Sequence, residues 1–284
     1  MKIVLGGAQF GMKYGLLNSE KIKKKEFSKI EKLILKSNID FIDTASTYRN
    51  SEKIIGESRL NKLKIITKIK IPPNNRDNIK NSVNQIVFQS MKRLKTKNIY
   101  GLLVHDYKDL LGAKGIELLK ELKAFKEKKI VKKIGISIYS PNELEKIWKF
   151  WKPDLVQAPF NLFDQRILNS GWIDILKKHN IKIFVRSCFL QGLLVGNYNS
   201  LIISKKFKAL LNNFDNWCEH NEISRLKACL DFVRQFKKID FVIVGFNNYP
   251  QIKEILDVVK KKKFIVPKKF LVNNLNFIDP RKWN

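Results

Sequence analysis

Two side chains that could move a proton to or from a substrate lie close together near the start of the chain. Asp43 ends a short apolar segment, Phe41-Ile42, and Tyr48 follows it by five positions. A phenol has an ordinary pKa of about 10, so it becomes a useful acid near neutral pH only where its surroundings lower that value. The rest of the chain must therefore supply a positive charge beside Tyr48.

Two further candidate groups lie at the ends of the next two apolar segments. Lys68 stands near the end of residues 64–69, and His105 directly follows Leu102-Leu103-Val104. A buried ammonium lowers the pKa of a neighbouring phenol, and a carboxylate such as Asp43 keeps that ammonium charged. A neutral imidazole can donate a hydrogen bond to the same substrate oxygen. The set suits protonation of a carbonyl oxygen while a hydride reaches carbon, and a reduced cofactor must supply that hydride.

Each of the four residues also has a structural interpretation. A strand-end Asp often caps a helix, a tyrosine can be packing, a lysine can point from an edge to solvent, and a histidine can be satisfied in a core. Because the carboxyl ends of parallel barrel strands meet on one face, their positions after successive predicted strands favour the catalytic interpretation.

Short apolar segments alternate with amphipathic stretches along the chain, as in an α/β protein with a buried parallel sheet. The segments predicted as strands are residues 3–8, 41–45, 65–69, 101–105, 134–138, 155–160, 181–187 and 241–246. The stretches predicted as helices are residues 22–37, 78–94, 115–128, 141–151, 164–178 and 249–259. This alternation predicts one domain over residues 1–284, an eight-stranded parallel (β/α)8 TIM barrel.

An open doubly wound sheet is the alternative architecture. Against it, residues 6–11, with the sequence GGAQFG, lack both the spacing of a GxGxxG motif and an immediate helix. Residues 197–236 exceed the length of one connection, which predicts an insertion together with the seventh barrel helix. We expect the tail after residue 266 to pack over one end of the barrel.

The composition restricts the classes of partner. The formal net charge of +30 raises nucleic acid or an anionic membrane surface as partners. The basic residues are nevertheless spread along helical segments and are mostly Lys, in a chain also rich in Ile and Asn, as an AT-rich genome would produce. Solvated helix faces are therefore the favoured interpretation, with no specific nucleic acid and no membrane as partner.

Other residue types narrow the chemistry and the location. The three cysteines form no CxxC pair and no apolar run approaches a membrane span, which favours a reducing, cytoplasmic location. The three histidines form no HxH or HExxH pair, and no GxSxG motif is present, so neither a metal site nor a serine hydrolase is predicted.

The chain resembles the aldo-keto reductases over nearly its whole length, and its short bacterial members most of all. The motifs that carry the resemblance are residues 5–11, 43–48, 51–56, 67–68, 104–106, 135–137, 156–158, 191–194 and 244–245, with Gln251 and Glu254. The resemblance implies that Asp43, Tyr48, Lys68 and His105 are the catalytic tetrad, with Tyr48 as general acid.

The resemblance also implies a nicotinamide cofactor, with NADP as the family default and NAD as the alternative. From the nicotinamide to the adenosine end, the implied contacts are Ser137 and Gln157, then Arg186, then Gly245, Asn247, Asn248 and Gln251.

Several positions depart from the family pattern. Ile138 replaces an Asn, and Arg186 replaces an aromatic residue, although a planar guanidinium can also stack on the nicotinamide. No Arg or Lys stands at the usual 2′-phosphate position within residues 247–251, although Lys253 is near. Arg49 replaces a glycine, either as an ordinary exposed loop residue or as a contact for an anionic substrate.

These features predict NAD(P)H-dependent reduction of an aldehyde or ketone. The resemblance makes a sugar-type carbonyl one candidate substrate, and the positive charge would favour an anionic one. The alternative function is a cofactor-binding regulatory or sensor protein on the same barrel, with little turnover. The sequence leaves monomer and homo-oligomer both open.

Overall fold

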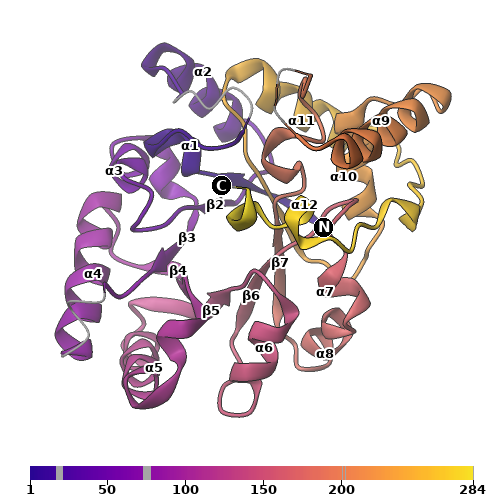
Figure 1. Ribbon diagram of the computed structural model, residues 1–284. Helices are drawn as coiled ribbons and strands as arrows, with labels where there is room; N and C mark the ends of the chain where they lie inside the picture. The colour runs from indigo at the N-terminus through magenta and orange to yellow at the C-terminus, as the bar shows by residue number, and fades with distance from the viewer. Residues whose placement is uncertain (17–21, 73–77, 200, 202, 284) are drawn as a thin grey trace.

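Parallel strands close into a ring at the centre of the molecule (Figure 1). The computed structural model describes residues 1–16, 22–72, 78–199, 201 and 203–283. The strands pair in sequence order and β8 returns to β1, with every pair parallel. The strands are β1 (Lys2–Gly6), β2 (Phe41–Asp43), β3 (Lys64–Ile69), β4 (Ile99–Val104), β5 (Val131–Ser137), β6 (Leu155–Pro159), β7 (Lys182–Arg186) and β8 (Phe241–Val244). The closed barrel confirms the predicted fold and excludes the open sheet.

Helices surround this ring (Figure 1). The α-helices are α1 (Ala8–Gly11), α2 (Lys24–Leu35), α3 (Ser51–Gly56), α4 (Ile79–Leu94), α5 (Gly112–Glu127), α6 (Pro141–Trp148), α7 (Arg166–Asn169), α8 (Trp172–Lys178), α9 (Lys205–His220), α10 (Arg225–Arg234), α11 (Tyr249–Lys260) and α12 (Leu275–Ile278). Short 3₁₀ helices are η1 (Arg59–Lys62), η3 (Tyr107–Leu110), η4 (Leu190–Gly192), η5 (Lys268–Phe270) and η6 (Pro280–Lys282).

The single helix predicted over residues 164–178 is wrong. Gly171 has a φ of 75° and separates α7 from α8. This left-handed conformation suits glycine and cannot continue an α-helix.

Just before α7, the Asp164 carboxylate is held by the Arg166 guanidinium, with N–O distances of 2.8 and 2.7 Å.

The C-terminal tail packs over the carboxyl ends of the strands, as expected for one barrel end. The Val272 amide donates to the Phe163 carbonyl at 2.9 Å, and the Gln165 side chain donates to the Lys268 carbonyl at 3.0 Å. Phe163 and Gln165 both follow β6. Figure 1 shows the yellow tail, with α12, lying over the ring. The long region 197–236 contains α9 and α10.

Two layers of side chains fill the barrel interior. An apolar plug contains one residue from each of seven strands: Val4, Phe41, Ile66, Leu103, Leu155, Phe184 and Ile243. Side chains in a strand repeat every two residues on one face. The next inward layer therefore consists of the residues two positions further along, here called the polar layer: Gly6, Asp43, Lys68, His105, Gln157, Arg186 and Gly245. The carboxyl end of the barrel thus receives every predicted tetrad member that stands on or directly after a strand.

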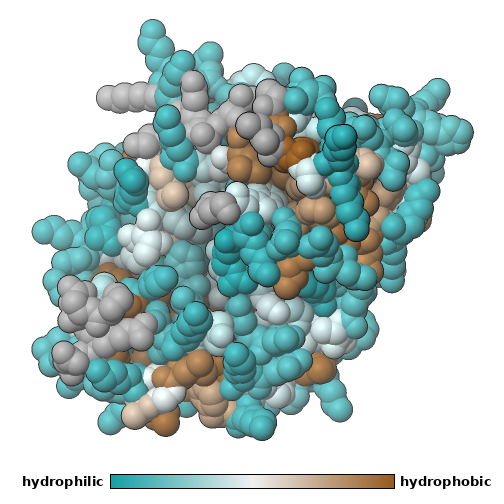
Figure 2. Space-filling model, in the orientation of Figure 1, coloured by the Kyte–Doolittle hydropathy of each residue, from teal (hydrophilic) through white to brown (hydrophobic). Residues whose placement is uncertain are grey.

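Hydrophilic side chains lie around most of the edge of the face shown in Figure 2, and apolar residues gather near α10 and α11 and at the lower edge near α5. None of the described helices combines the length and the apolar character needed to cross a membrane.

A buried carboxylate ties β3 to the helix layer. Thr67 points outward from β3, and its hydroxyl donates to Glu52 of α3 at 2.6 Å. The Arg93 guanidinium of α4 contacts the same carboxylate at 2.7 Å. Glu52 is fully buried, so both partners are needed to offset its desolvation.

We predict that Glu52→Ala lowers the free energy of unfolding by about 2–4 kcal/mol, since it leaves Thr67 and Arg93 without their common partner. Chemical denaturation measures the change. The control is Lys53→Ala on the same helix, whose 3.9 Å pair with Glu57 is exposed and which we expect to cost less than about 1 kcal/mol. Equal losses in the two variants would contradict a role for Glu52 as an anchor.

Candidate active site

Lys68 is the charged centre of the polar layer. Its side chain is 1% exposed, and Nζ donates to Asp43 Oδ2 at 2.7 Å and to the Thr44 carbonyl at 2.8 Å. A buried ammonium needs such partners, because burial otherwise drives it to the neutral form. Burial lowers the pKa of Lys68, and the Asp43 carboxylate opposes that shift.

Asp43 joins Lys68 to the next polar groups. Its Oδ1 accepts a hydrogen bond from Gln157 Nε2 at 2.7 Å, and Ser137 donates to Gln157 Oε1 at 3.5 Å. A chain of contacts thus crosses the barrel from β3 through β2 to β6 and β5. It fixes the orientation of the Gln157 amide, because Oε1 must face a donor and Nε2 an acceptor.

The loop after β2 carries Tyr48 and is held close to Lys68. The amide and the hydroxyl of Ser46 both donate to the Lys68 carbonyl, each at 2.9 Å. A Cβ at Gly11 would lie 2.0 Å from the Tyr48 carbonyl oxygen, so only glycine lets α1 pass this close. Lys68 Nζ lies 5.1 Å from the centre of the Tyr48 ring, within the range of a cation–π contact.

His105 completes the group. Its ring meets the Tyr48 ring edge-on, with centroids 5.9 Å apart and an interplanar angle of 78°. Its Nδ1 lies 3.3 Å from the Thr47 hydroxyl. The structure therefore brings Asp43, Tyr48, Lys68 and His105 together, and their catalytic roles remain predictions.

The expected lowering of the Tyr48 pKa is wrong. Burial raises the pKa of Tyr48, the Asp43 carboxylate raises it further, and Arg186 is the cation that opposes the rise. Asp43 lies so close to the Lys68 ammonium that it offsets much of its charge. Tyr48 is accordingly a neutral phenol near pH 7, able to donate its proton.

The His105 imidazole is also neutral, as predicted. Burial lowers its pKa from 6.5 to about 3, and the charges of Lys68 and Arg186 act in the same direction. A neutral imidazole carries one N–H donor and one acceptor. With Nδ1 beside the Thr47 hydroxyl, the other nitrogen can serve a substrate oxygen.

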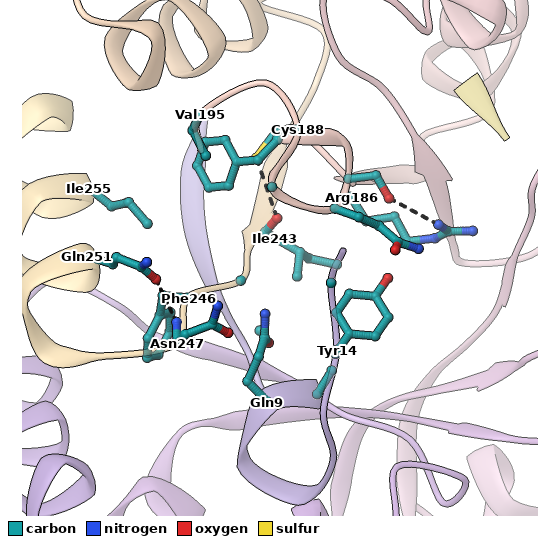
Figure 3. Close-up of a pocket in the computed structure, with 18 of the residues that line it drawn as sticks. Gln9, Tyr14, Arg186, Cys188, Val195, Ile243, Phe246, Asn247, Gln251 and Ile255 are labelled. Carbon is teal, nitrogen blue, oxygen red and sulfur yellow. Dashed lines mark hydrogen bonds between the residues drawn. The ribbon is translucent and has the colours of Figure 1, made fainter. Parts of the chain in front are cut away.

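A cavity of about 460 Å³ is lined by Asp43 and Tyr48 of this group, and its size is typical of sites for small molecules and cofactors. Figure 3 shows Gln251 and Ile255 on one side and Arg186 and Tyr14 on the other, with Asn247 between them.

The predicted cofactor contacts divide into two groups. The residues that line the cavity are Gln157, Arg186, Gly245, Asn247 and Gln251. Ser137 reaches it only through Gln157. The Asn248 side chain instead caps α11 by accepting from the Gln251 amide at 3.0 Å.

Gly245 and Gln157 determine what the walls of the cavity offer to a ligand. A Cβ on Gly245 would lie 2.7 Å from Gln9 Nε2, so the glycine keeps this wall open. Gln157 brings an amide to the cavity beside Asp43, and an amide can both donate to and accept from a carboxamide. These residues fit a nicotinamide dinucleotide.

The structure adds residues that the sequence did not identify. Tyr14 lines the cavity near Arg186, and Arg225 of α10 lines it too. The Tyr139 ring contacts two arginines that are distant in sequence. The guanidinium carbons of Arg186 and Arg281 lie 4.3 and 4.1 Å from its ring centre. No motif or spacing predicts these contacts.

Arg49 is exposed and is not among the residues that line the cavity.

Groups of acidic, histidine or cysteine side chains suited to a metal ion do not occur within the described part of the chain.

Comparison with known proteins gives a family. Residues 2–265 match the model of the Aldo/keto reductase family. Among solved structures, the holo form of an aldo-keto reductase from Bacillus halodurans is 17% identical, with a TM-score of 0.76 over 93% of this chain and 88% of that one. A glycerol dehydrogenase from Gluconobacter oxydans is 19% identical, with a TM-score of 0.71 over 98% and 92% of the two chains. No curated protein sequence matches.

We predict that His105 stays neutral down to about pH 4 in the folded protein, because its pKa is lowered to about 3. The unfolded imidazole gains a proton near pH 6.5. This residue's contribution to stability is therefore complete above about pH 6.5 and declines as the pH falls toward 3. NMR titration of the imidazole measures the pKa, with the His105→Gln spectrum as the assignment control. A midpoint above pH 5 would contradict the prediction.

Proposed function

The chain belongs to the aldo/keto reductase family, and we propose that it reduces an aldehyde or ketone to an alcohol with NADPH or NADH. Tyr48 is the general acid in this proposal. The observation that carries it is the cluster around Lys68, which lies 2.7 Å from Asp43 and 5.1 Å from the centre of the Tyr48 ring. The bound reduced nicotinamide would supply the hydride.

The proton comes from the Tyr48 hydroxyl. Its raised pKa keeps it protonated until negative charge develops on the substrate oxygen. As the proton leaves, a phenolate forms beside the Lys68 ammonium, which stabilises it in a site of low dielectric. Neutral His105 donates a hydrogen bond to the same substrate oxygen and orients the carbonyl.

The residues that would hold the cofactor lie along the cavity. Gln157, held by the Ser137 hydroxyl behind it, would bind the carboxamide, while Asn247 and Gln251 would face the adenosine end. Lys253 and Glu254 are both exposed at that end, but Glu254 lines the cavity and Lys253 does not. A carboxylate can accept from a ribose hydroxyl and repels a 2′-phosphate. We infer that NADH is used beside NADPH, the family default.

We predict that Tyr48→Phe lowers kcat by about 10²- to 10⁴-fold, the usual contribution of a positioned general acid. Steady-state reduction of a panel of aldehydes, sugar aldehydes and keto-sugars measures the loss. Tyr100→Phe is the matched control, since its ring packs on Phe41 in the apolar plug, and we expect it to retain activity. Wild-type turnover in the Tyr48→Phe protein would refute Tyr48 as the acid. Tight cofactor binding with no turnover of any carbonyl would instead support the sensor function.

For the cofactor, we predict that the dissociation constants of NADH and NADPH differ by no more than about tenfold. The reason is that residues 247–251 contain no Arg or Lys, the residue types that would bind the 2′-phosphate of NADPH and so favour it over NADH. Fluorescence titration of the purified protein with each cofactor measures both dissociation constants. Arg225→Met tests the basic residue that does line the cavity, and Lys253→Met is the exposed control. NADPH binding more than about a hundredfold tighter would overturn the inference.

A further inference from the structure

Arg186 places a positive charge at one end of the cavity, and none of the described residues offers it an acidic partner. Its guanidinium donates to the Ile138 carbonyl at 3.0 Å and to the Ser187 hydroxyl at 3.3 Å. Within the part of the chain that the structure describes, no Asp or Glu oxygen lies within ion-pair distance of it. A guanidinium has five N–H donors, and the described residues take two of them, which leaves donors for a ligand.

Arg281 gives an internal comparison, because it packs against the same Tyr139 ring. Its guanidinium is held by Asp279 at 2.9 and 2.6 Å, and it lies 3.7 Å from Glu143. The protein thus neutralises the charge of Arg281 but leaves that of Arg186 facing the cavity. The Tyr139 ring and the Ile138 carbonyl hold the Arg186 fork in one orientation, which reduces the entropy lost when an anion binds.

Tyr14 adds an uncharged donor at the same end. Figure 3 shows its hydroxyl on the side of the cavity where Arg186 lies. Burial raises its pKa to about 12, although the charge of Arg186 opposes the rise. The phenol therefore keeps its proton and can donate it in a hydrogen bond.

We propose that Arg186 and Tyr14 form a subsite for an anionic group, a carboxylate or a phosphate, carried by the carbonyl substrate. The proposal rests on the proposed reductase function and names its substrate class. Planar guanidinium donors match either anion in a two-point contact. Arg186 and Tyr14 line the same cavity as Tyr48, so one small molecule can place its carbonyl at Tyr48 and its anion at Arg186.

The test compares charged and neutral carbonyls of matched size. The carboxylate arm uses 4-oxobutanoate against butanal, and the phosphate arm uses glyceraldehyde 3-phosphate against glyceraldehyde. We expect the wild-type protein to prefer one charged member through a lower KM. Arg186→Met should reduce that preference by about 10- to 100-fold, the effect of losing a hydrogen-bonded charge pair. Arg186→Lys should retain part of it, and Tyr14→Phe should reduce it less.

Arg49→Asn is the matched control. It removes an equal charge from the loop that carries Tyr48, and Asn tolerates the left-handed conformation of this position, where φ is 48°. An equal loss of preference in this variant would assign the effect to the overall positive field and overturn the subsite. An unchanged preference in Arg186→Met, with a raised KM for the cofactor, would assign Arg186 to nicotinamide stacking and also overturn it.

A binding measurement separates this proposal from the reductase function. Calorimetric titration with 4-hydroxybutanoate and with glycerol 3-phosphate needs no turnover. Anion binding that is lost in Arg186→Met but kept in Arg49→Asn supports the subsite, whether or not a carbonyl of the panel is reduced. If no carbonyl is reduced, that result counts against the proposed reductase function alone. Equal binding by wild type and Arg186→Met, or no binding by either, overturns the subsite.

Discussion

The organisation of the site depends on one buried ion pair. Lys68 can remain charged inside the barrel only because Asp43 lies 2.7 Å away and the Thr44 carbonyl takes a second N–H. Asp43 also accepts from Gln157, so the same carboxylate positions the amide group of β6. The loop that carries Tyr48 is fastened to the Lys68 carbonyl through Ser46. Loss of this pair would therefore disturb the ammonium, the amide and the phenol together.

The period of the strands explains why the polar groups meet. Phe41, Ile66 and Leu103 fill the apolar plug, and Asp43, Lys68 and His105 follow them by two residues. Each strand therefore contributes one residue to stability and the next inward residue to the site. Asp43, Lys68 and Gln157 are tolerated here because they hydrogen-bond to one another within the layer, while His105 and Arg186 find their partners in the loops beside it.

The sequence was sufficient to predict what strand period and chain order determine. All eight strands were predicted, and the four tetrad candidates lie together because each stands at the carboxyl end of a barrel strand or on the loop after it. Contacts between distant segments could not be predicted: Arg281 reaches Tyr139 from the tail, and Tyr14 reaches the cavity from an irregular loop. The direction of the Tyr48 pKa shift was also missed. It depends on the balance between burial and the charges of Asp43 and Arg186, which requires positions in space.

That balance links substrate binding to the proton of Tyr48. Arg186 is the cation that opposes the raised pKa of Tyr48, so an anion bound to Arg186 would offset this influence. When the anionic group of the substrate is bound, the Tyr48 hydroxyl would then hold its proton more firmly before reaction. Stabilisation of the phenolate would fall to Lys68, whose ammonium lies beside the ring. In the proposed reaction the two cations would thus have separate roles, Arg186 in binding the anionic group of the substrate and Lys68 in stabilising the charge that proton transfer leaves behind.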